Sequence, residues 1–245
     1  MKEFGNTLRQ TFRINYKEIF SYAGISAAGA LLGMVFILIG MVTVGKSEGS
    51  YANVGAILSL MFGEAMFLFG GIFSVQYDFN LAVSMGKARR YFVPARYLCM
   101  VLNGLIILGI VKLVNFLERA LYPVLYPGAV CGMDIDWILG RPAVFIGFVL
   151  GLPSLILLLG ALIMKFSTKF YWGIWAFWML GFMGIPRLLS AGKKHPDSLA
   201  GKAGNLLMDL AGGVTGAGLM AALLCGTGAG ILIALLILKK QRVTL

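Results

Sequence analysis

An acidic residue stands in the middle of a long apolar run. Glu64 lies within Met61–Phe67, where every neighbour is apolar or glycine. An ionisable group at this depth is costly in a bilayer and usually faces protein or a water-filled cavity. Two roles remain open, a carboxylate on a translocation pathway that contacts a proton or substrate, or a protonated or hydrogen-bonded side chain packed against another helix. Because no Asp, Arg or Lys is expected opposite it at mid-depth, the sequence favours the packing role.

The segment Gly40–Ser47 matches the phosphate-binding pattern G-x-x-x-x-G-K-S. That loop works because it follows a buried strand and opens a helix whose N-terminal amides surround phosphate groups. Here the first half ends an apolar run of membrane-helix length, and a short polar turn, Glu48–Asn53, follows. We interpret the match as a coincidence and expect the chain to bind no cofactor directly.

Other reactive residue types are scattered. The one histidine, His195, stands beside Pro196 in a turn-like stretch, which favours a loop residue over a ligand. Asp134 and Asp136 form a carboxylate pair in the loop Leu117–Arg141, whose aromatic residues favour interfacial anchoring over acid–base chemistry. An odd number of cysteines without metal-ligand spacing argues against a disulfide framework or a metal site. They are Cys99, Cys131 and Cys225. We therefore expect no catalytic residue and no metal site in this chain.

The composition is that of a membrane protein. The mean hydropathy is +0.88, with 59% hydrophobic and only 13% charged residues, whereas soluble domains average about 45–50% and about 25%. A bilayer core of about 30 Å requires about 20 apolar residues in a helix. Six stretches meet this requirement, so the predicted fold is all-α with six transmembrane helices. They are Phe20–Val44, Asn53–Val75, Ala95–Phe116, Pro142–Met164, Phe170–Leu189 and Val214–Leu238.

Basic residues predict the orientation of these helices. With the N-terminus inside and six crossings, thirteen of the 21 Lys and Arg residues fall on the cytoplasmic side, where such residues concentrate. We therefore expect a multi-pass protein of the bacterial cytoplasmic (inner) membrane with both termini in the cytoplasm. The net charge of +11 follows mainly from this bias, so no nucleic acid partner is expected.

The first nineteen residues carry a helical stripe. Apolar residues recur at spacings of four and three, which predicts an amphipathic helix lying in the inner interface before the first span. They are Phe4, Leu8, Phe12, Tyr16 and Ile19. The alternative is a cytoplasmic extension of the first spanning helix.

Pairs of glycines four residues apart predict close helix packing. Such pairs let helix backbones approach, although with 33 glycines some arise by chance. They begin at Gly29, Gly147, Gly212 and Gly226.

The longest polar island between apolar runs is Gln76–Arg96. Asp78 can begin a helix, Phe79, Val83 and Met85 would give it one apolar side, and Gly86 can end it. Anionic headgroups would account for the basic residues that follow. Anionic headgroups do not account for the part of the island before these basic residues, which has an apolar side and little charge. The basic residues are Lys87, Arg89 and Arg90.

The stretch Phe79–Phe92 resembles the loop between the second and third helices of ABC type-2 (type V) exporter permeases, in particular the small Gram-positive ones. There an apolar helix is followed by Ser-Met-Gly, basic residues and an aromatic residue, as in Ser84–Gly86 and beyond. The six predicted spans, the N-terminal amphipathic helix and the length of 245 residues also agree with that family.

The resemblance implies a single permease domain over 1–245, with an interfacial helix at 1–19, helices 1–2 in 20–75, a cytoplasmic coupling segment at 76–94, helices 3–4 in 95–164, and helices 5–6 with the tail in 165–245. The short coupling helix would dock its apolar side into a separate nucleotide-binding ATPase subunit, which supplies ATP and magnesium. A second permease chain would complete a homodimer or heterodimer. The residues implied in coupling are Asp78, Phe79, Leu81, Val83, Ser84, Met85, Gly86, Lys87, Arg89 and Arg90.

Two classes of function follow. The first is the membrane subunit of an ABC exporter, itself not an enzyme, for an amphipathic peptide, an antimicrobial or another hydrophobic substrate, with a role in antimicrobial resistance. The second is a self-sufficient protein, either a proton-coupled carrier that uses Glu64 or a membrane scaffold. The absence of a large outer domain and of a fused ATPase sets the chain apart from larger members of the family.

Overall fold

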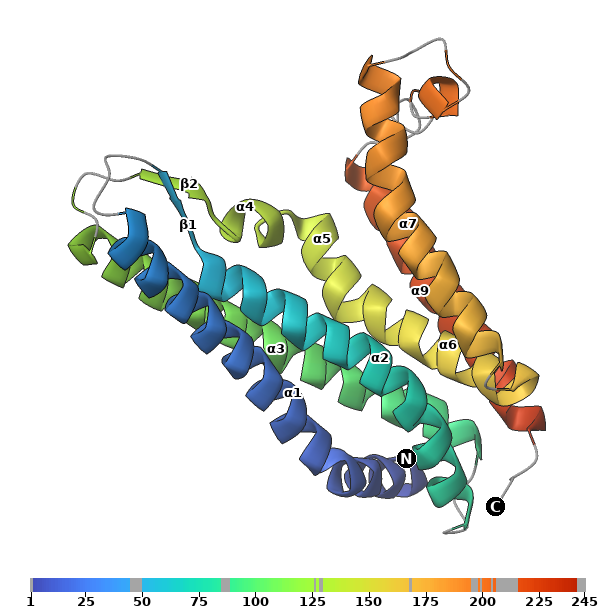
Figure 1. Cartoon of the computed structure of the whole chain (residues 1–245). Coiled ribbons are helices and arrows are strands. Elements are labelled where there is room, and N and C mark those ends of the chain that lie inside the picture. The colour runs from blue at the N-terminus through green and yellow to red at the C-terminus, as the bar shows by residue number, and fades with distance from the viewer. Residues whose placement is uncertain are drawn as a thin grey trace.

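The computed structural model describes residues 2–44, 50–84, 89–125, 127, 130–167, 169–194, 198, 200–203, 205 and 216–241. Most of these residues are helical (Figure 1). The long helices are α1 (Lys2–Val44), α2 (Val54–Ser84), α3 (Arg89–Leu125), α6 (Leu152–Phe166), α7 (Lys169–Lys194) and α9 (Gly216–Lys240).

Short elements lead into α6. A four-residue helix, α4 (Asp136–Leu139), precedes α5 (Pro142–Ile146), and a π-helical turn, η1 (Gly147–Gly151), joins α5 to α6. Pro142 at the first position of α5 starts the helix without losing a hydrogen bond. The strands β1 (Ser50–Ala52) and β2 (Val130–Met133) pair in parallel, which the all-α prediction did not include.

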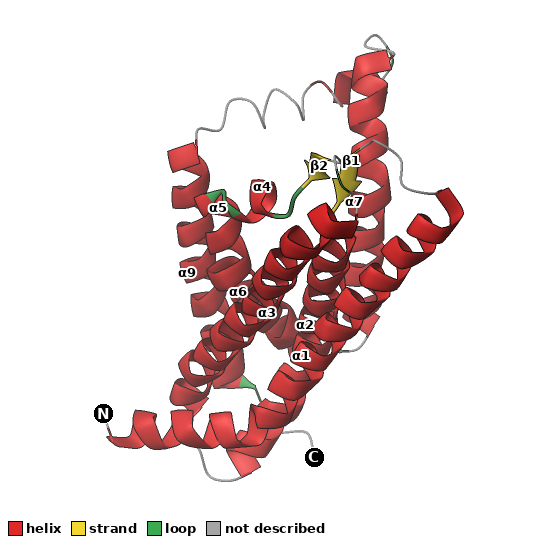
Figure 2. Ribbon diagram, turned by 90° about the vertical axis from the view of Figure 1, so that its left-hand side faces the viewer, coloured by secondary structure: helices red, strands yellow, loops and turns green. Residues whose placement is uncertain are grey.

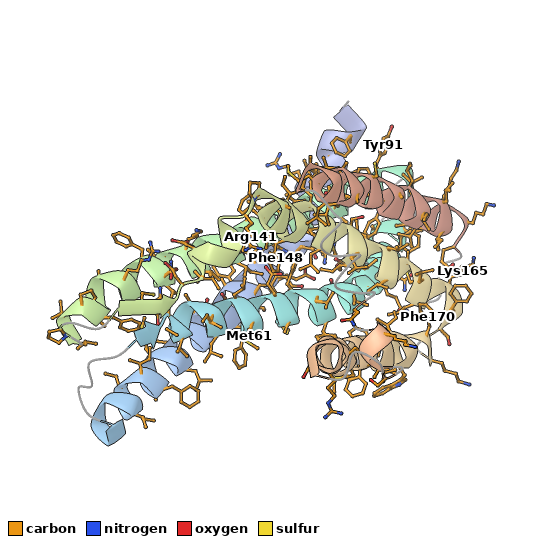
Figure 3. The ribbon with its side chains drawn as sticks, turned by 90° about the horizontal axis from the view of Figure 1, so that it is seen from above. Met61, Tyr91, Arg141, Phe148, Lys165 and Phe170 are labelled. Carbon is orange, nitrogen blue, oxygen red and sulfur yellow. The ribbon has the colours of Figure 1, made fainter. Side chains whose placement is uncertain are left out.

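The helices form a bundle with two distinct ends. At one end α1 begins, α2 ends, α3 begins and α9 ends, and we name it the terminal end (Figures 1 and 2). The opposite, far end carries β1, β2 and α4. Helices α1, α2 and α3 contact one another, and α6 contacts α2, α7 and α9. Seen from above, α7 and α9 lie on opposite sides of α6 (Figure 3).

The buried core follows the contacts among α2, α3 and α6. Phe67 on α2, Ile107 on α3 and Ile156 on α6 are fully buried members of it. Exposed apolar side chains cover the outer faces of the long helices, as expected where lipid replaces water.

Five helical segments within the described residues are long and apolar enough to cross a membrane. They are Phe4–Gly40, Val54–Ser84, Tyr91–Leu125, Pro142–Phe166 and Ala217–Lys240. The predicted fifth span, Phe170–Leu189, forms most of α7 but is not among them. Its aromatic residues with polar atoms, such as Tyr171, Trp172 and Trp175, and its glycines lower the hydropathy of this helix. The structure is therefore compatible with a multi-pass membrane protein, in which these five helices are long and apolar enough to cross the bilayer.

The close packing predicted for Gly29 and Gly33 is confirmed between α1 and α2. A Cβ atom added at Gly29 would lie 2.7 Å from the carbonyl oxygen of Leu58. One added at Gly33 would lie 2.6 Å from the backbone nitrogen of Gly55. Only glycine lets the two backbones approach this closely.

The first turns of α1 lie across the terminal end, and the rest of the helix climbs along the bundle (Figure 2). Their buried face is polar, since Thr7, Thr11 and Asn15 are buried. Within the predicted apolar stripe Tyr16 is exposed, and the other members are half-buried, namely Phe4, Leu8, Phe12 and Ile19. This arrangement suits contact with a membrane interface, although α1 is one helix and not two.

Candidate functional site

The predicted coupling segment differs from expectation in its secondary structure. Asp78 does not begin a helix, because α2 continues through it to Ser84. Residues 76–84 contain neither Gly nor Pro, so nothing in the backbone interrupts the helix, and the Asp78 carboxylate binds a side chain instead of capping. Met85, Gly86 and Lys87 lie outside the described residues. Arg89 and Arg90 begin α3, and their side chains are likewise outside the description.

The face of α2 that was expected to dock a partner is turned into the bundle. Phe79 is 0% exposed, and its ring meets that of Phe92 on α3 edge to face, with 5.4 Å between centroids. Val83 packs against the same core. The exposed side of this helix end instead carries Tyr77, 67% exposed, with Leu81 and Ser84 at spacings of four and three. Any partner at this end meets these three residues before it meets Phe79.

Arg96 joins three helices beneath this segment. Its side chain is 0% exposed, and Nη2 lies 2.8 Å from Glu18 Oε2 on α1 and 3.1 Å from Asp78 Oδ2 on α2. The same nitrogen donates a hydrogen bond of 2.5 Å to Ser74 Oγ on α2. We name Glu18, Ser74, Asp78 and Arg96 the arginine clasp. It fixes the end of α2, the start of α3 and the lower part of α1 to one another.

Sequence reasoning missed the clasp because it counted Arg96 as one more basic residue of a cytoplasmic loop. A buried charge costs several kcal/mol unless it is paired. An arginine at the second position of the predicted span Ala95–Phe116, with an acid 18 positions before it, was the available signal (96 − 78 = 18). That signal is weak, because sequence separation does not reveal which helices meet.

A second polar cluster holds the far end together. Glu118, 1% exposed, accepts hydrogen bonds from the backbone N–H groups of Gly55 at 2.8 Å and Ala56 at 2.9 Å. These amides belong to the first turn of α2, where a negative charge is favourable. Tyr122, one turn later on α3, donates a further hydrogen bond to the same carboxylate. Glu118 therefore caps α2 from a neighbouring helix.

The carboxylate pair Asp134 and Asp136 belongs to this far-end cluster. Arg119 on α3 pairs with both carboxylates, and its contact with Asp136 measures 3.1 Å. Lys112 also pairs with Asp136, and Asn115 donates a hydrogen bond of 3.0 Å to Asp134. Both carboxylates are thus engaged in fastening the loop to α3. The spacing of Lys112, Asn115 and Arg119 along one helix face was the sequence signal for this role.

We expect Glu118→Gln to lower the free energy of unfolding by about 1–3 kcal/mol, because one of the two amides of α2 loses its acceptor. Thermal unfolding in mild detergent measures the change. Lys112→Gln, which removes a half-exposed partner at the same end, is the matched control and should cost about 1 kcal/mol or less. Equal losses for the two variants would contradict the capping role.

Glu64 lies inside α2, away from both of its ends. Gly71 approaches Ile156, and Gly160 approaches Val75, so α2 and α6 run with an offset of 85 residues (156 − 71 and 160 − 75). The same offset places Glu64 level with Val149 in η1. Both carboxylate oxygens of Glu64 are buried without a hydrogen-bond partner within the described part of the chain. The extrapolated offset thus places a mid-helix acid at about the depth of a π-helical turn, an irregularity often found at functional sites.

The other residues singled out in the sequence are those of the phosphate-loop match, the histidine and the cysteines. Gly40–Val44 are the last residues of α1, so the first half of the phosphate-loop match is helical, whereas a phosphate loop follows a strand. The rest of that match and His195 lie outside the described residues. All three cysteines are free thiols, and only Cys225 is exposed.

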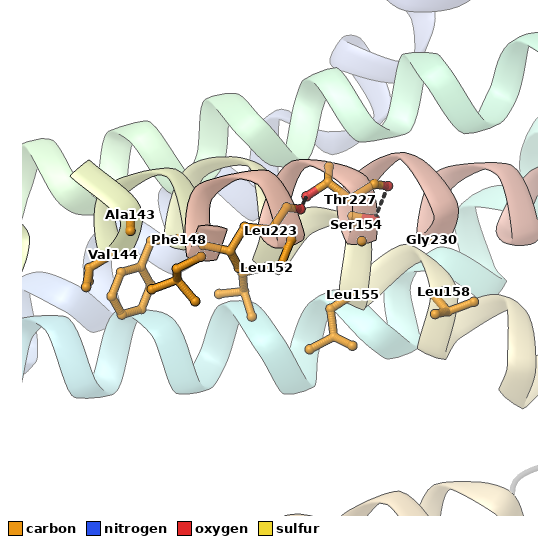
Figure 4. A pocket seen from close by; sticks show the side chains of 15 residues that line it. Ala143, Val144, Phe148, Leu152, Ser154, Leu155, Leu158, Leu223, Thr227 and Gly230 are labelled. Atoms are coloured by element: carbon orange, nitrogen blue, oxygen red, sulfur yellow. Dashed lines mark hydrogen bonds between the residues drawn. The ribbon is translucent and has the colours of Figure 1, made fainter. Parts of the chain in front are cut away.

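A groove between α6 and α9 has no counterpart in the sequence predictions. It has a volume of about 680 Å³ and is lined by α5, η1, α6 and α9 (Figure 4). Two of the predicted glycine pairs, Gly147 with Gly151 and Gly226 with Gly230, line it. Among the described residues, the apolar groove and the arginine clasp therefore join Glu64 as candidate functional features.

Comparisons of the chain with known protein families, with curated proteins and with solved structures found no match.

Proposed function

We propose that this chain is the membrane-spanning subunit of an exporter whose ATPase is a separate protein. The proposal rests on the resemblance of Phe79–Phe92 to ABC type-2 exporter permeases. The observation that carries it furthest is the arginine clasp, because it sits immediately behind the connection between α2 and α3. A force applied to that connection would move α1, α2 and α3 together.

The length of α2 supports a docking role for its last turns. Thirty-one helical residues extend about 46 Å, whereas the bilayer core is about 30 Å thick. With Val54 at the far surface, the core ends near Ser74, so Tyr77, Leu81 and Ser84 project beyond it. An exposed aromatic side chain next to a half-buried leucine is the kind of anchor on which protein interfaces depend.

In the proposed mechanism a nucleotide-binding subunit, one per permease chain, docks on the stripe of Tyr77, Leu81 and Ser84. Closure of two such subunits around ATP and magnesium displaces the end of α2. The clasp passes the displacement to α1 through Glu18 and to α3 through Arg96. The bundles of two permease chains then rock between inward and outward access for a hydrophobic or peptide substrate.

The proposal is tested by affinity purification of the chain from its native cells in mild detergent. We expect an ATP-hydrolysing subunit to co-purify with the wild-type chain at a ratio near one to one. Tyr77→Asp places a charge at the proposed anchor and should weaken the association by about thirtyfold, or about 2 kcal/mol. Leu81→Asp should act in the same direction.

Lys169→Glu is the matched control, since it also changes the charge of an exposed residue at the start of α7, at the terminal end. It should leave the co-purified subunit unchanged. Retention of the subunit by the Tyr77 and Leu81 variants would contradict the docking stripe.

One observation favours a second candidate function, a self-sufficient proton-coupled carrier. The carboxylate oxygens of Glu64 have no hydrogen-bond partner among the described residues, and an unpaired acid inside a membrane is the usual element of a proton pathway. Under this alternative Glu64→Gln abolishes transport while no ATPase accompanies the chain. Under the exporter proposal the same variant retains the bound ATPase.

A further inference from the structure

The groove between α6 and α9 has an apolar lining. Phe148, Leu152 and Leu155 come from η1 and α6, and Leu219 and Leu223 come from α9 (Figure 4). A surface of this kind favours an apolar occupant through the hydrophobic effect and dispersion contacts. It also includes the π-helical turn η1, an irregularity that often marks a binding site in a helix.

The two hydroxyl groups in the groove are directed to the backbone. Ser154 Oγ donates a hydrogen bond of 2.8 Å to the carbonyl oxygen of Thr227, and Thr227 Oγ1 donates one of 2.7 Å to that of Leu223 (Figure 4). Both donors are therefore engaged already. A polar ligand that entered the groove would lose its hydrogen bonds to water without replacement, so the part of a ligand that lies here is hydrocarbon.

The glycines on the groove hold it open instead of closing it. A Cβ atom added at Gly226 meets no atom within 4 Å, and one added at Gly151 meets only Thr227 Oγ1, at 4.0 Å. At Gly230, by contrast, an added Cβ atom would lie 2.5 Å from Ser154 Oγ. The two helices therefore touch at Gly230 and leave free space beside Gly151 and Gly226.

The length of the groove suits a single acyl chain. From Ala143 to Leu158 it follows fifteen residues (158 − 143), or about 22 Å at the rise of a helix. Half of a bilayer core is about 15 Å, so the groove accommodates the full depth of one leaflet.

The far end of the groove carries a positive charge. Arg141 is exposed and immediately precedes α5, two residues before the lining residue Ala143. In the view from above, Arg141 and Phe148 are labelled close to each other (Figure 3). A cation at the surface end of an apolar groove complements an anionic headgroup with its chain inside the membrane.

We propose that this groove binds one acyl chain of an anionic phospholipid, with the phosphate headgroup at Arg141. The bound lipid belongs to the leaflet at the far end. The site is independent of the exporter proposal, because none of its residues belongs to the clasp or to the stripe of Tyr77, Leu81 and Ser84.

The test uses the purified full chain in phosphatidylcholine vesicles that contain phosphatidylglycerol with a diazirine on one acyl chain. After photolysis, mass spectrometry should find adducts on Leu155 and Leu223. Gly226→Phe fills the free space, and exclusion of even two methylene groups weakens binding about tenfold, so these adducts should fall about tenfold. Label on the lipid-facing Leu232, which is 63% exposed, should not change.

Gly228→Phe is the matched control. Gly228 lies two positions away on the opposite face of α9, and a Cβ atom there also meets nothing within 4 Å. It should leave the groove adducts intact. Leu155→Trp, read at Leu223, provides a second way to fill the groove if Gly226→Phe unfolds.

The headgroup is tested with the same diazirine on phosphatidylcholine. Labelling of the groove by phosphatidylglycerol should exceed that by phosphatidylcholine about fivefold in the wild type, and Arg141→Gln should remove the difference. The proposal is overturned by groove residues that stay unlabelled while Leu232 is labelled, by labelling that Gly226→Phe does not reduce, or by equal labelling from the two headgroups. Adducts between Leu223 and a second copy of the chain would likewise overturn it and assign the groove to a dimer contact.

Discussion

Arg96→Met is expected to lower the free energy of unfolding by about 3–5 kcal/mol, the largest effect of any single change considered for this chain. The substitution keeps a long side chain but leaves Glu18 and Asp78 without their shared cation. Asp78 is buried, and a buried carboxylate without a partner is strongly destabilising. For a domain of this size the loss corresponds to a decrease of about 6–20 °C in the melting temperature measured in mild detergent.

Arg119→Met is the control for the arginine clasp. Arg119 also pairs with two carboxylates, but its side chain is about half exposed, so its removal should cost about 1 kcal/mol or less. Adding Glu18→Gln and Asp78→Asn to Arg96→Met removes the uncompensated charges and should recover part of the loss. Equal melting temperatures for Arg96→Met and Arg119→Met would show that the clasp does not hold the three helices together.

Gly33→Leu is expected to produce the second large effect, a loss of about 1–3 kcal/mol or more. Its Cβ atom would lie 2.6 Å from the nitrogen of Gly55 and 2.8 Å from the carbonyl carbon of Val54. Backbone atoms cannot rotate away as a side chain can, so α1 and α2 must separate. The melting temperature should fall by about 2–12 °C.

Gly24→Leu tests whether this effect is specific to the helix contact. Gly24 lies on the same helix, but an added Cβ atom meets nothing within 4 Å, and leucine has a higher helix propensity than glycine. This variant should be neutral or slightly more stable than the wild type. A loss at Gly24 as large as at Gly33 would contradict the packing explanation.

The lengths of the apolar runs predicted most of the helices. The predicted Pro142–Met164 corresponds to α5, η1 and α6 over 142–166, and the predicted Val214–Leu238 to α9. This agreement arises because the thickness of the bilayer sets a minimum length for a spanning helix, and the length of an apolar run can be read directly from the sequence. It does not set where a helix ends beyond the membrane, which is why α2 extends past Val75 to Ser84.

The direction in which Phe79 points could not be predicted. In a soluble protein an apolar stripe indicates the buried face, since the other face meets water. In a membrane protein lipid and protein interior are equally apolar, so the stripe does not distinguish them. The first turns of α1 likewise bury the polar residues Thr7 and Thr11 while Tyr16 is exposed.

The burial and the partners of the polar residues inside the bundle could not be predicted from the sequence either. Arg96 and Glu118 each read as a charge near a helix end, yet both are buried and join separate helices. Glu18, a partner of Arg96, lies 78 positions from it in the sequence, and Gly55, a partner of Glu118, lies 63 positions from it. Such pairings depend on which helices are neighbours, which a hydropathy pattern does not specify.

Photo-crosslinking in intact cells tests the proposed docking of a separate ATPase on the exposed end of α2. A photoreactive amino acid in place of Tyr77 should form an adduct that contains this chain and an ATP-hydrolysing subunit. The same amino acid in place of Leu232, an exposed residue of α9, should not form that adduct. Adducts of the Tyr77 position with lipid or with a second copy of the chain alone would contradict the account.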